Sequence, residues 1–594
     1  MGNRARRSVP IVAGALLVAA ALLVYRPGPL HGLRNWGVHF ATYLPAWAQI
    51  AFWLPAALLA FSSHARALIL AAVAAWGRIL AGTADPRARR RIGDLLVPVG
   101  ITILFWLLRS RYVFLGDNGL RLEQATQGRV LPFEWGTMFL AHRAVVLGRD
   151  WFQWEPRLSL AVFDTLAGLP FAIAAVSIAR SMGRTALQRG AIHLGLLSLG
   201  AVQLFCGYVE AYSWAMALVT AYLAGLLRAL RGGSWARPAL LLALAVAMHA
   251  VSVLFALPLL LSLRRGRAGS PGWVLADVSA TAVRGIAALL IAVAAAAPLV
   301  LPRLFHGYGS SRAGDLTLLS PVLWWERVNG MLLAGVAGTL IGLPLLATIF
   351  TTPRALGAQK LHLGAVALPA LAALLPMKMV LGAADWDIIA FAGLPLLVWT
   401  ASWIVSERDP AAEDLAGLAR SGRWAFVPLL LFMSLANTGG FIAVNHGETS
   451  VRRIREIVSD DPAPYYRDHP PPVHLSMLFG MNGLMEPCRG VLLEGMKTYP
   501  NDPRLPHNLA SVYFQEERWE EAKQWARRTL DLCPGYVPSL RLLYSVTLRQ
   551  GDRGAQIARG GEILEAHARD PVAIERYFSA AELQAMREAV AAGR

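Results

Sequence analysis

The stretch IGDLLVPVGITILFWLL, residues 92–108, precedes the stretch LGDNGLRLE, residues 115–123. The first stretch is apolar and long enough to cross the roughly 30 Å hydrocarbon core of a membrane as a helix. Four arginines lie in the loop before it, between residues 87 and 91. Because arginine-rich loops stay on the cytoplasmic side, Asp117 and Glu123 are expected on the opposite face, close to the membrane surface. Ionisable side chains at that depth are costly and tend to be functional.

The composition is that of a membrane protein. Of 594 residues, 56% are hydrophobic and 16% are charged, whereas soluble domains are about 25% charged. Apolar runs of spanning length recur along the chain, which predicts an all-α fold: a polytopic transmembrane helix bundle of about eleven spans. The net charge of +18 comes mostly from arginines in short loops, so it indicates topology, and no nucleic-acid partner is expected.

One apolar stretch, Pro238–Leu263, is predicted to be a short helical hairpin rather than a crossing. A single crossing would put the arginines that follow it on the outside. With the hairpin, the later loops carry nine arginines and lysines inside and four outside, which agrees with the positive-inside rule. His249, at the apex, is expected to be a packing residue. This topology places everything after Phe441 on the extracytoplasmic side.

The chain is expected to divide into four parts. They are two N-terminal spans and an arginine-rich cytoplasmic loop in residues 1–90, a membrane domain in 91–443 with its first extracytoplasmic loop at 111–157, a linker in 444–468, and a soluble helical domain in 469–594. The segment Ile11–Val24 fits either a signal peptide or a first membrane anchor.

The last part carries a helical-repeat pattern. One repeat shows the large, small, aromatic, alanine, alanine and proline positions of tetratricopeptide repeats, at Leu509, Ala510, Tyr513, Ala522, Ala526 and Pro534. The upstream copy has Leu475, Phe479, Cys488, Leu492 and Pro500, and a weaker copy begins at Leu543 and Tyr544 and ends near Pro571. Three repeats predict a small α-solenoid, which either binds a protein partner or braces the chain. Cys488 and Cys533 are expected to be small buried hydrophobes, although a disulfide between them is open.

The residues best suited to chemistry lie in the extracytoplasmic segments. Asp117 is a candidate general base or metal ligand, with a helix N-cap as the alternative. Glu123 lies about two helical turns on and has a weaker claim. Tyr208 and Glu210, in Gly207-Tyr208-Val209-Glu210, resemble a sugar-contacting shelf, while the alternative is that Glu210 reaches interfacial water.

Two further segments carry candidate ligand-binding groups. Asp385-Trp386-Asp387 follows Lys378, and its paired acids suit a divalent cation such as Mg or Mn. Positive charge for a phosphate is expected from Lys378 and from three residues of an earlier loop, Arg303, His306 and Arg312. The alternative for both segments is a loop held by a structural ion pair. No Walker, GxSxG or HExxH motif occurs, so ATP-driven transport, serine hydrolysis and zincin proteolysis are not supported.

With these segments, the chain resembles the GT-C superfamily of membrane glycosyltransferases, which includes protein O-mannosyltransferases and lipid A aminoarabinose transferases. The resemblance covers roughly residues 92–443, and Gly207–Glu210 and Asp385–Asp387 look like a bacterial subgroup with repeat tails. It implies a polyprenyl-phosphate sugar donor and an essential acid in the first large extracytoplasmic loop, where Asp117 is the matching position. Many relatives have a second acid at the place of Asn118.

The expected function is therefore an inverting hexosyl- or pentosyltransferase of the bacterial inner (cytoplasmic) membrane, in contact with membrane lipids. It would transfer a sugar from a lipid-linked donor to a protein, lipid or glycan, with the repeat domain periplasmic. Asp117 would be catalytic, Trp386 and the other polar residues named above would bind substrate, and Asp385 and Asp387 would hold a metal. The alternatives are an O-antigen-ligase-like transferase and a non-enzymatic membrane-anchored repeat scaffold.

Overall fold

The computed structural model describes most of the chain, namely residues 2–25, 38, 42–81, 92–112, 114, 118–262, 324–325, 327–335, 358–374, 386–405, 414–420, 423–460 and 470–593. These residues are helical wherever they have regular structure, and no strand occurs among them. The chain forms two compact units, Met1–Arg453 and Ile454–Arg594. The all-α prediction is confirmed for the described residues.

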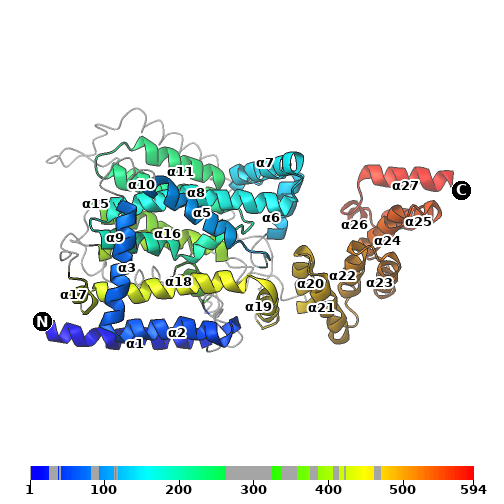
Figure 1. The fold of residues 1–594 in the computed structure, drawn as a ribbon. Helices are drawn as coiled ribbons and strands as arrows, with labels where there is room; N and C mark the ends of the chain where they lie inside the picture. The colour runs from blue at the N-terminus through cyan, green and yellow to red at the C-terminus, as the bar shows by residue number, and fades with distance from the viewer. Residues whose placement is uncertain are drawn as a thin grey trace. The chain divides into compact units, whose positions relative to one another are not determined.

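Unit 1 contains the following elements in chain order (Figure 1): α1 Gly2–Tyr25, α2 Ala46–Phe61, α3 Ser63–Ala81, η2 Ile92–Leu96, α5 Val97–Leu107, α6 Asn118–Gln127, η3 Pro132–Glu134, α7 Trp135–Phe152, α8 Pro156–Met182, α9 Ala186–Leu197, η4 Gly200–Phe205, α10 Ser213–Ala229, α11 Ala236–Met248, η5 Ala250–Phe255, α12 Leu257–Ser262, α15 Ala358–Leu374, α16 Trp386–Ile404, α17 Leu415–Arg420, η9 Arg423–Ala425, α18 Val427–Val444 and the start of α19 Gly447–Asp460.

Fewer helices have the length of a membrane crossing than the sequence predicted. Among the described residues, three are long and apolar enough, α3, α8 and α18. Eight shorter apolar stretches of 10–17 residues accompany them. The expectation of about eleven full-length spans is therefore wrong for the part of the chain that the structure describes, and most of residues 263–357 lie outside that part.

The apolar run Ala191–Cys206, which has the length of a span in the sequence, shows why apolar length overestimated the spans. The helix α9 ends at Leu197, and the chain continues as the 3₁₀ segment η4. A Cβ on Gly200 would lie 1.8 Å from the carbonyl oxygen of Leu333, so the backbone approaches its neighbour as closely as glycine permits. Hydropathy does not detect this break.

Contacts define two ends of unit 1. At one end, Ser213 at the start of α10 donates a hydrogen bond to Asp164 near the start of α8. At the other end, Arg228 in the last turn of α10 donates to Ser177 of α8 over 2.8 Å. The helices α8 and α10 therefore run side by side in the same direction. We call the first the Glu134 end, after a buried residue near it. We call the second the Arg180 end, after a basic residue that lies there.

The helix α3 falls in a segment that the sequence analysis treated as a loop. It packs against α9, where a Cβ on Gly77 would lie 1.7 Å from the Ala186 carbonyl oxygen. At the start of α3, Arg66 donates to Ala419 of α17 over 2.8 Å, and near its other end Leu80 accepts from Arg180 over 2.8 Å. In Figure 1, α3 runs crosswise to α18. It thus lies across the Arg180 end, although its length and composition would suit a crossing.

The chain turns back at His249, as the sequence predicted. The helix α11 packs against α10 and brings His249 onto Tyr212, with ring centroids 4.5 Å apart. Further along α10, Tyr222 donates to the carbonyl oxygen of Phe255 over 2.8 Å. His249 lies at Tyr212 and Phe255 lies at Tyr222, which is further along α10. The segment after His249 therefore runs back alongside α10.

Unit 2 is a stack of helix pairs (Figure 1): α20 Pro471–Met481, α21 Met485–Thr498, α22 Arg504–Gln515, α23 Trp519–Leu532, α24 Val537–Gln550 and α25 Arg553–Arg569, followed by α26 Pro571–Glu575 and α27 Ala580–Ala592. The first helices of the pairs begin every 33 residues and the second helices every 34 residues. Ala522 and Ala526 are fully buried against Ala510 and Leu543. Cys488 and Cys533 are free thiols, and Cys488 is buried.

The boundary between the two units, between Arg453 and Ile454, falls inside the predicted linker 444–468. This segment contains the helix α19. The helix was missed because its arginines and acids suggested a solvated connector. Their spacing instead leaves Ser450, Arg453, Ile454 and Val458 on a buried face.

Candidate functional site at the Glu134 end

A buried ion pair lies at the Glu134 end of unit 1. Glu134 closes the short segment η3 and has no exposed surface, and Arg121 of α6 is 6% exposed. A guanidinium nitrogen of Arg121 contacts Oε1 of Glu134 and also donates to Gln124 over 3.3 Å. Two charges so fully removed from water are stable only as a well-bonded pair. The pair therefore ties α6, which directly follows Asp117 in the sequence, to η3.

His249 joins this pair from the turn between α11 and η5. Its Nε2 lies 4.0 Å from Oε2 of Glu134, and its Nδ1 accepts a hydrogen bond from the backbone N–H of Val251 over 3.3 Å. Because Nδ1 is an acceptor, the neutral ring carries its proton on Nε2, which faces Glu134. Tyr212 stacks on the ring, and Phe133 and Phe391 lie about 6 Å from it, centroid to centroid. His249 therefore packs against aromatic rings and also turns its Nε2–H toward Glu134.

Two further acids approach Arg121. Glu210 and Asp164 line a narrow cavity with room for about one water molecule, together with Arg121 and Thr137. Asp164 accepts hydrogen bonds from the Ser213 hydroxyl and from the backbone of Glu210. Glu210 is 4% exposed, so it does not reach interfacial water, which was the alternative weighed from the sequence. The Glu134 end therefore holds three buried carboxyl groups, of which Glu134 pairs with Arg121 and the other two line a cavity with it.

The segment Gly207–Glu210 is held close to the backbone of its neighbours. Gly207 has φ +62°, and a Cβ there would lie 3.2 Å from Cβ of Ala161 and 3.4 Å from Cβ of Arg109. Only glycine combines this conformation with this contact easily. Tyr208 is buried and within electrostatic reach of Arg453. The motif noted in the sequence is thus a buried connector that carries Glu210 into the cavity.

A cationic cluster lies beside this connector. Arg157 donates to the backbone oxygen of Arg111 over 2.5 Å, and Arg109 lies 4.3 Å from the Trp106 ring centroid. His446, just after α18, is close enough to Arg111 and Arg109 to interact with both. Burial and these two arginines lower the pKa of His446, so the imidazole is neutral at pH 7. Three arginines therefore lie in this region, one of them also interacting with Glu155.

Most of the residues predicted to act on substrate lie outside the described residues. These are Asp117, Arg303, His306, Arg312, Lys378 and Asp385. Trp386 and Asp387 begin α16, the helix that brings Phe391 to the His249 ring. Glu123 is exposed on α6 and accepts a hydrogen bond from Gln127 over 3.0 Å, so it does not join the cavity. Among the described residues, no group of three or more His, Cys, Asp or Glu side chains is arranged to hold a metal ion.

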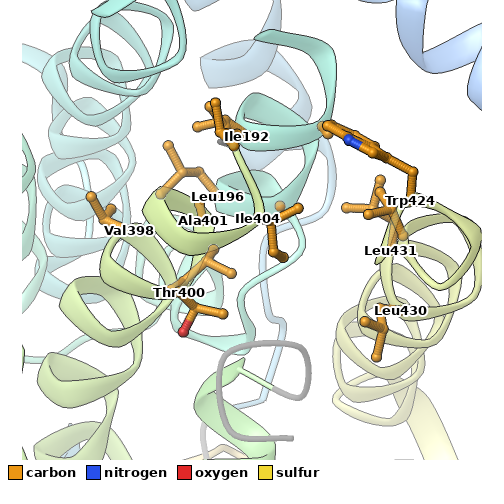
Figure 2. Close-up of a pocket in the computed structure, with 14 residues that line it drawn as sticks. Ile192, Leu196, Val398, Thr400, Ala401, Ile404, Trp424, Leu430 and Leu431 are labelled. Carbon is orange, nitrogen blue, oxygen red and sulfur yellow. The ribbon is translucent and has the colours of Figure 1, made fainter. Parts of the chain in front are cut away.

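A separate apolar groove of about 590 Å³ lies between α9, α16 and α18, toward the Arg180 end. Figure 2 shows Ile192, Leu196, Ile404, Leu431 and Trp424 around it. Its Thr400 hydroxyl donates to the Leu396 carbonyl of its own helix. The groove holds no charged group and offers no chemistry.

Several residues of the site were not predicted from the sequence. Asp164 lies inside the apolar run Leu158–Ala179, and an acid within such a run is a signal that could have singled it out. Glu134 is the lone acid in Leu131-Pro132-Phe133-Glu134-Trp135, a weaker signal. Nothing local distinguishes Arg121 from other arginines. Comparison with protein-family models, curated protein sequences and solved structures finds no match to this chain.

Proposed function

We propose that unit 1 is a membrane glycosyltransferase that moves a sugar from a polyprenyl-phosphate donor to a protein, lipid or glycan acceptor on the extracytoplasmic face. The observation that carries the proposal is the buried charged cluster at the Glu134 end. Glu134, Asp164 and Glu210 are each less than 5% exposed in an apolar helical unit. Burying ionisable groups costs stability, so a functional reason is expected for so many at one end.

In this proposal Asp117 is the general base. Its carboxylate takes the proton of the acceptor hydroxyl, and the acceptor oxygen attacks the anomeric carbon from the face opposite the phosphate. The bond from that carbon to the phosphate oxygen breaks, and polyprenyl phosphate leaves with the bonding electrons. The anomeric configuration is inverted. The support for Asp117 is that it directly precedes α6, whose Arg121 is tied to Glu134.

The leaving phosphate needs positive charge placed in advance. The cluster of Arg109, Arg111 and Arg157 supplies it from the described residues, and Lys378 with the arginines of residues 303–312 would add to it. Glu210 and Tyr208 would contact the sugar. Asp385 and Asp387 would hold a divalent cation if one takes part, and no step is assigned to it.

Unit 2 is proposed to be a tetratricopeptide domain that binds a protein partner in the periplasm. The repeat length of such domains is about 34 residues, and the helix pairs here begin every 33 and 34 residues. The periplasmic location follows from the turn at His249 and the positive-inside rule. Reporter fusions after Leu263 and after Asp468 test it: a cytoplasmic signal from the second fusion would contradict the proposed topology.

The decisive experiment for the reaction is single-turnover transfer in nanodiscs with a panel of polyprenyl-phosphate sugars. Asp117→Asn keeps the shape and the capping oxygen of the side chain but removes the basic carboxylate. The rate should fall by about two orders of magnitude or more at unchanged expression. The matched change Asn118→Asp, which adds an acid next to Asp117, should be tolerated. Full activity of Asp117→Asn would contradict the proposal and favour the membrane-anchored scaffold.

A further inference from the structure

Four arginines converge at the Arg180 end, each from a different helix. Arg180 lies in the last turn of α8, Arg189 in the first turns of α9, Arg228 in the last turn of α10 and Arg237 at the start of α11. Arg228 interacts electrostatically with Arg237 and Arg180, and Arg189 interacts with Arg180. Within the part of the chain that the structure describes, the one carboxylate recorded among them is Asp94, which contacts Arg180 and also interacts with Arg228.

Direct bonds fix this arrangement. Arg228 reaches across to α8 and donates to Ser177 over 2.8 Å, which places its guanidinium one helical turn from Arg180. Arg189 turns back toward the end of α8 and donates to the carbonyl of Gly183 over 3.4 Å. Two guanidinium atoms, Nη2 of Arg180 and Nε of Arg189, are buried without a hydrogen-bond acceptor among the described residues. The cluster therefore has an excess of donors as well as of charge.

Topology alone does not explain this convergence. The positive-inside rule accounts for arginines in loops, and the helix dipole favours a cation in the last turn of α8 and of α10. Neither effect brings the side chains of four helices together, where like charges repel and Asp94 interacts with Arg180 and Arg228. Arg231 illustrates the difference: it lies in the turn before α11 and is exposed, as Arg237 is, but no contact of its side chain with the cluster is recorded among the described residues. A bound anion would account for the arrangement.

We propose that the Arg180 cluster binds the phosphate headgroup of an anionic membrane phospholipid. The helix α8 has 27 residues and is about 40 Å long, so a helix of this length crosses the roughly 30 Å hydrocarbon core and reaches the headgroup layer. Arg180 lies in its last turn, at the depth of lipid phosphates. Basic pockets between membrane helices on the cytoplasmic side bind such headgroups. The inference rests on the membrane placement of unit 1 and not on the sugar-transfer reaction.

The site is tested on the full chain by native mass spectrometry, with phosphatidylglycerol titrated into protein held in a neutral detergent. Each arginine near an anionic lipid surface contributes a binding free energy that corresponds to about a fivefold change in affinity. Arg228→Gln and Arg237→Gln should each weaken binding of the first phosphatidylglycerol molecule about fivefold. The double variant should weaken this binding about 25-fold. The matched control Arg231→Gln should change it less than about twofold. Equal effects of Arg231→Gln and Arg237→Gln would mean diffuse surface charge and overturn the proposal.

Two further measurements keep the test decisive. Thermal unfolding in nanodiscs should show stabilisation by phosphatidylglycerol over phosphatidylcholine in the wild type and not in the double variant. In phosphatidylcholine the double variant should be at least as stable as the wild type, because neighbouring like charges are removed; a less stable double variant would overturn the proposal. Inorganic phosphate and glycerol 1-phosphate serve as soluble probes. If either displaces the lipid at millimolar concentration and stabilises the protein in phosphatidylcholine, the ligand is a soluble phosphate and the lipid assignment is wrong.

Discussion

The two units of this chain bury different kinds of side chain. Unit 1 buries arginines, acids and histidines, including Arg121, Glu134 and Asp164. Among residues 470–593 the buried polar residues are Ser, Thr and Asn alone, and charged residues pair near the surface, as Arg541 and Glu582 do. A helical stack can therefore be held together by apolar packing. The charged interior of unit 1 is an addition that stability did not require, and it marks where function is to be sought.

The largest difference between the two units should appear when one charge pair is broken in each. Glu134→Gln leaves Arg121 buried without its anion, which costs about 3–5 kcal/mol. The same change at Glu582, whose pair with Arg541 is about 40% exposed on both sides, should cost less than about 1 kcal/mol. Thermal unfolding of both variants of the intact protein, with hydrogen exchange to assign the unit affected, makes the comparison. Similar effects at the two positions would remove the distinction between the units.

A second variant tests the apolar packing of unit 2. Ala522 is fully buried between paired helices, so Ala522→Arg forces a charge into the stack and should cost several kcal/mol, roughly 3 or more. Gln524→Arg, on the exposed face of the same helix, is the matched control and should be nearly neutral. Hydrogen exchange should show α22–α24 opened while unit 1 keeps its protection. An unchanged unfolding profile of Ala522→Arg would mean that the repeat register is wrong.

Much of unit 2 could be predicted from sequence because its pattern is local. Leu509, Ala510, Ala522 and Ala526 recur at fixed spacing and are buried as that spacing requires. In unit 1 the apolar runs predicted helices and the turn at His249. The site could not be assembled in the same way, because Glu134 meets His249 from 115 positions away in the chain and no local pattern encodes that contact. Breaks such as the one at Gly200 depend likewise on a distant backbone.

A smaller effect is expected on the stability of unit 2 as the pH is lowered. His507 contacts the Ser539 hydroxyl over 2.9 Å, and burial lowers its pKa from 6.5 to about 4. Between these pH values the unfolded chain binds a proton that the folded chain does not. Stability is therefore fully present above about pH 6.5 and falls as the pH is lowered to about 4, by at most about 3 kcal/mol. Urea unfolding of residues 470–594 at pH 7 and pH 4.5 should show this loss in the wild type. His507→Gln should reduce it, and an identical loss in the variant would exclude His507 as its source.

The central claim is that the buried charges at the Glu134 end belong to the site of sugar transfer. Glu210 and Glu123 test it most directly, because both acids were candidates from the sequence and the structure separates them: Glu210 is 4% exposed in the cavity, and Glu123 is exposed on α6. The measurement is single-turnover sugar transfer in nanodiscs by Glu210→Gln and Glu123→Gln, with thermal unfolding to verify folding. We expect Glu210→Gln to be slower by about tenfold or more and Glu123→Gln to stay within about twofold of the wild type. Equal rates for the two folded variants would contradict the account.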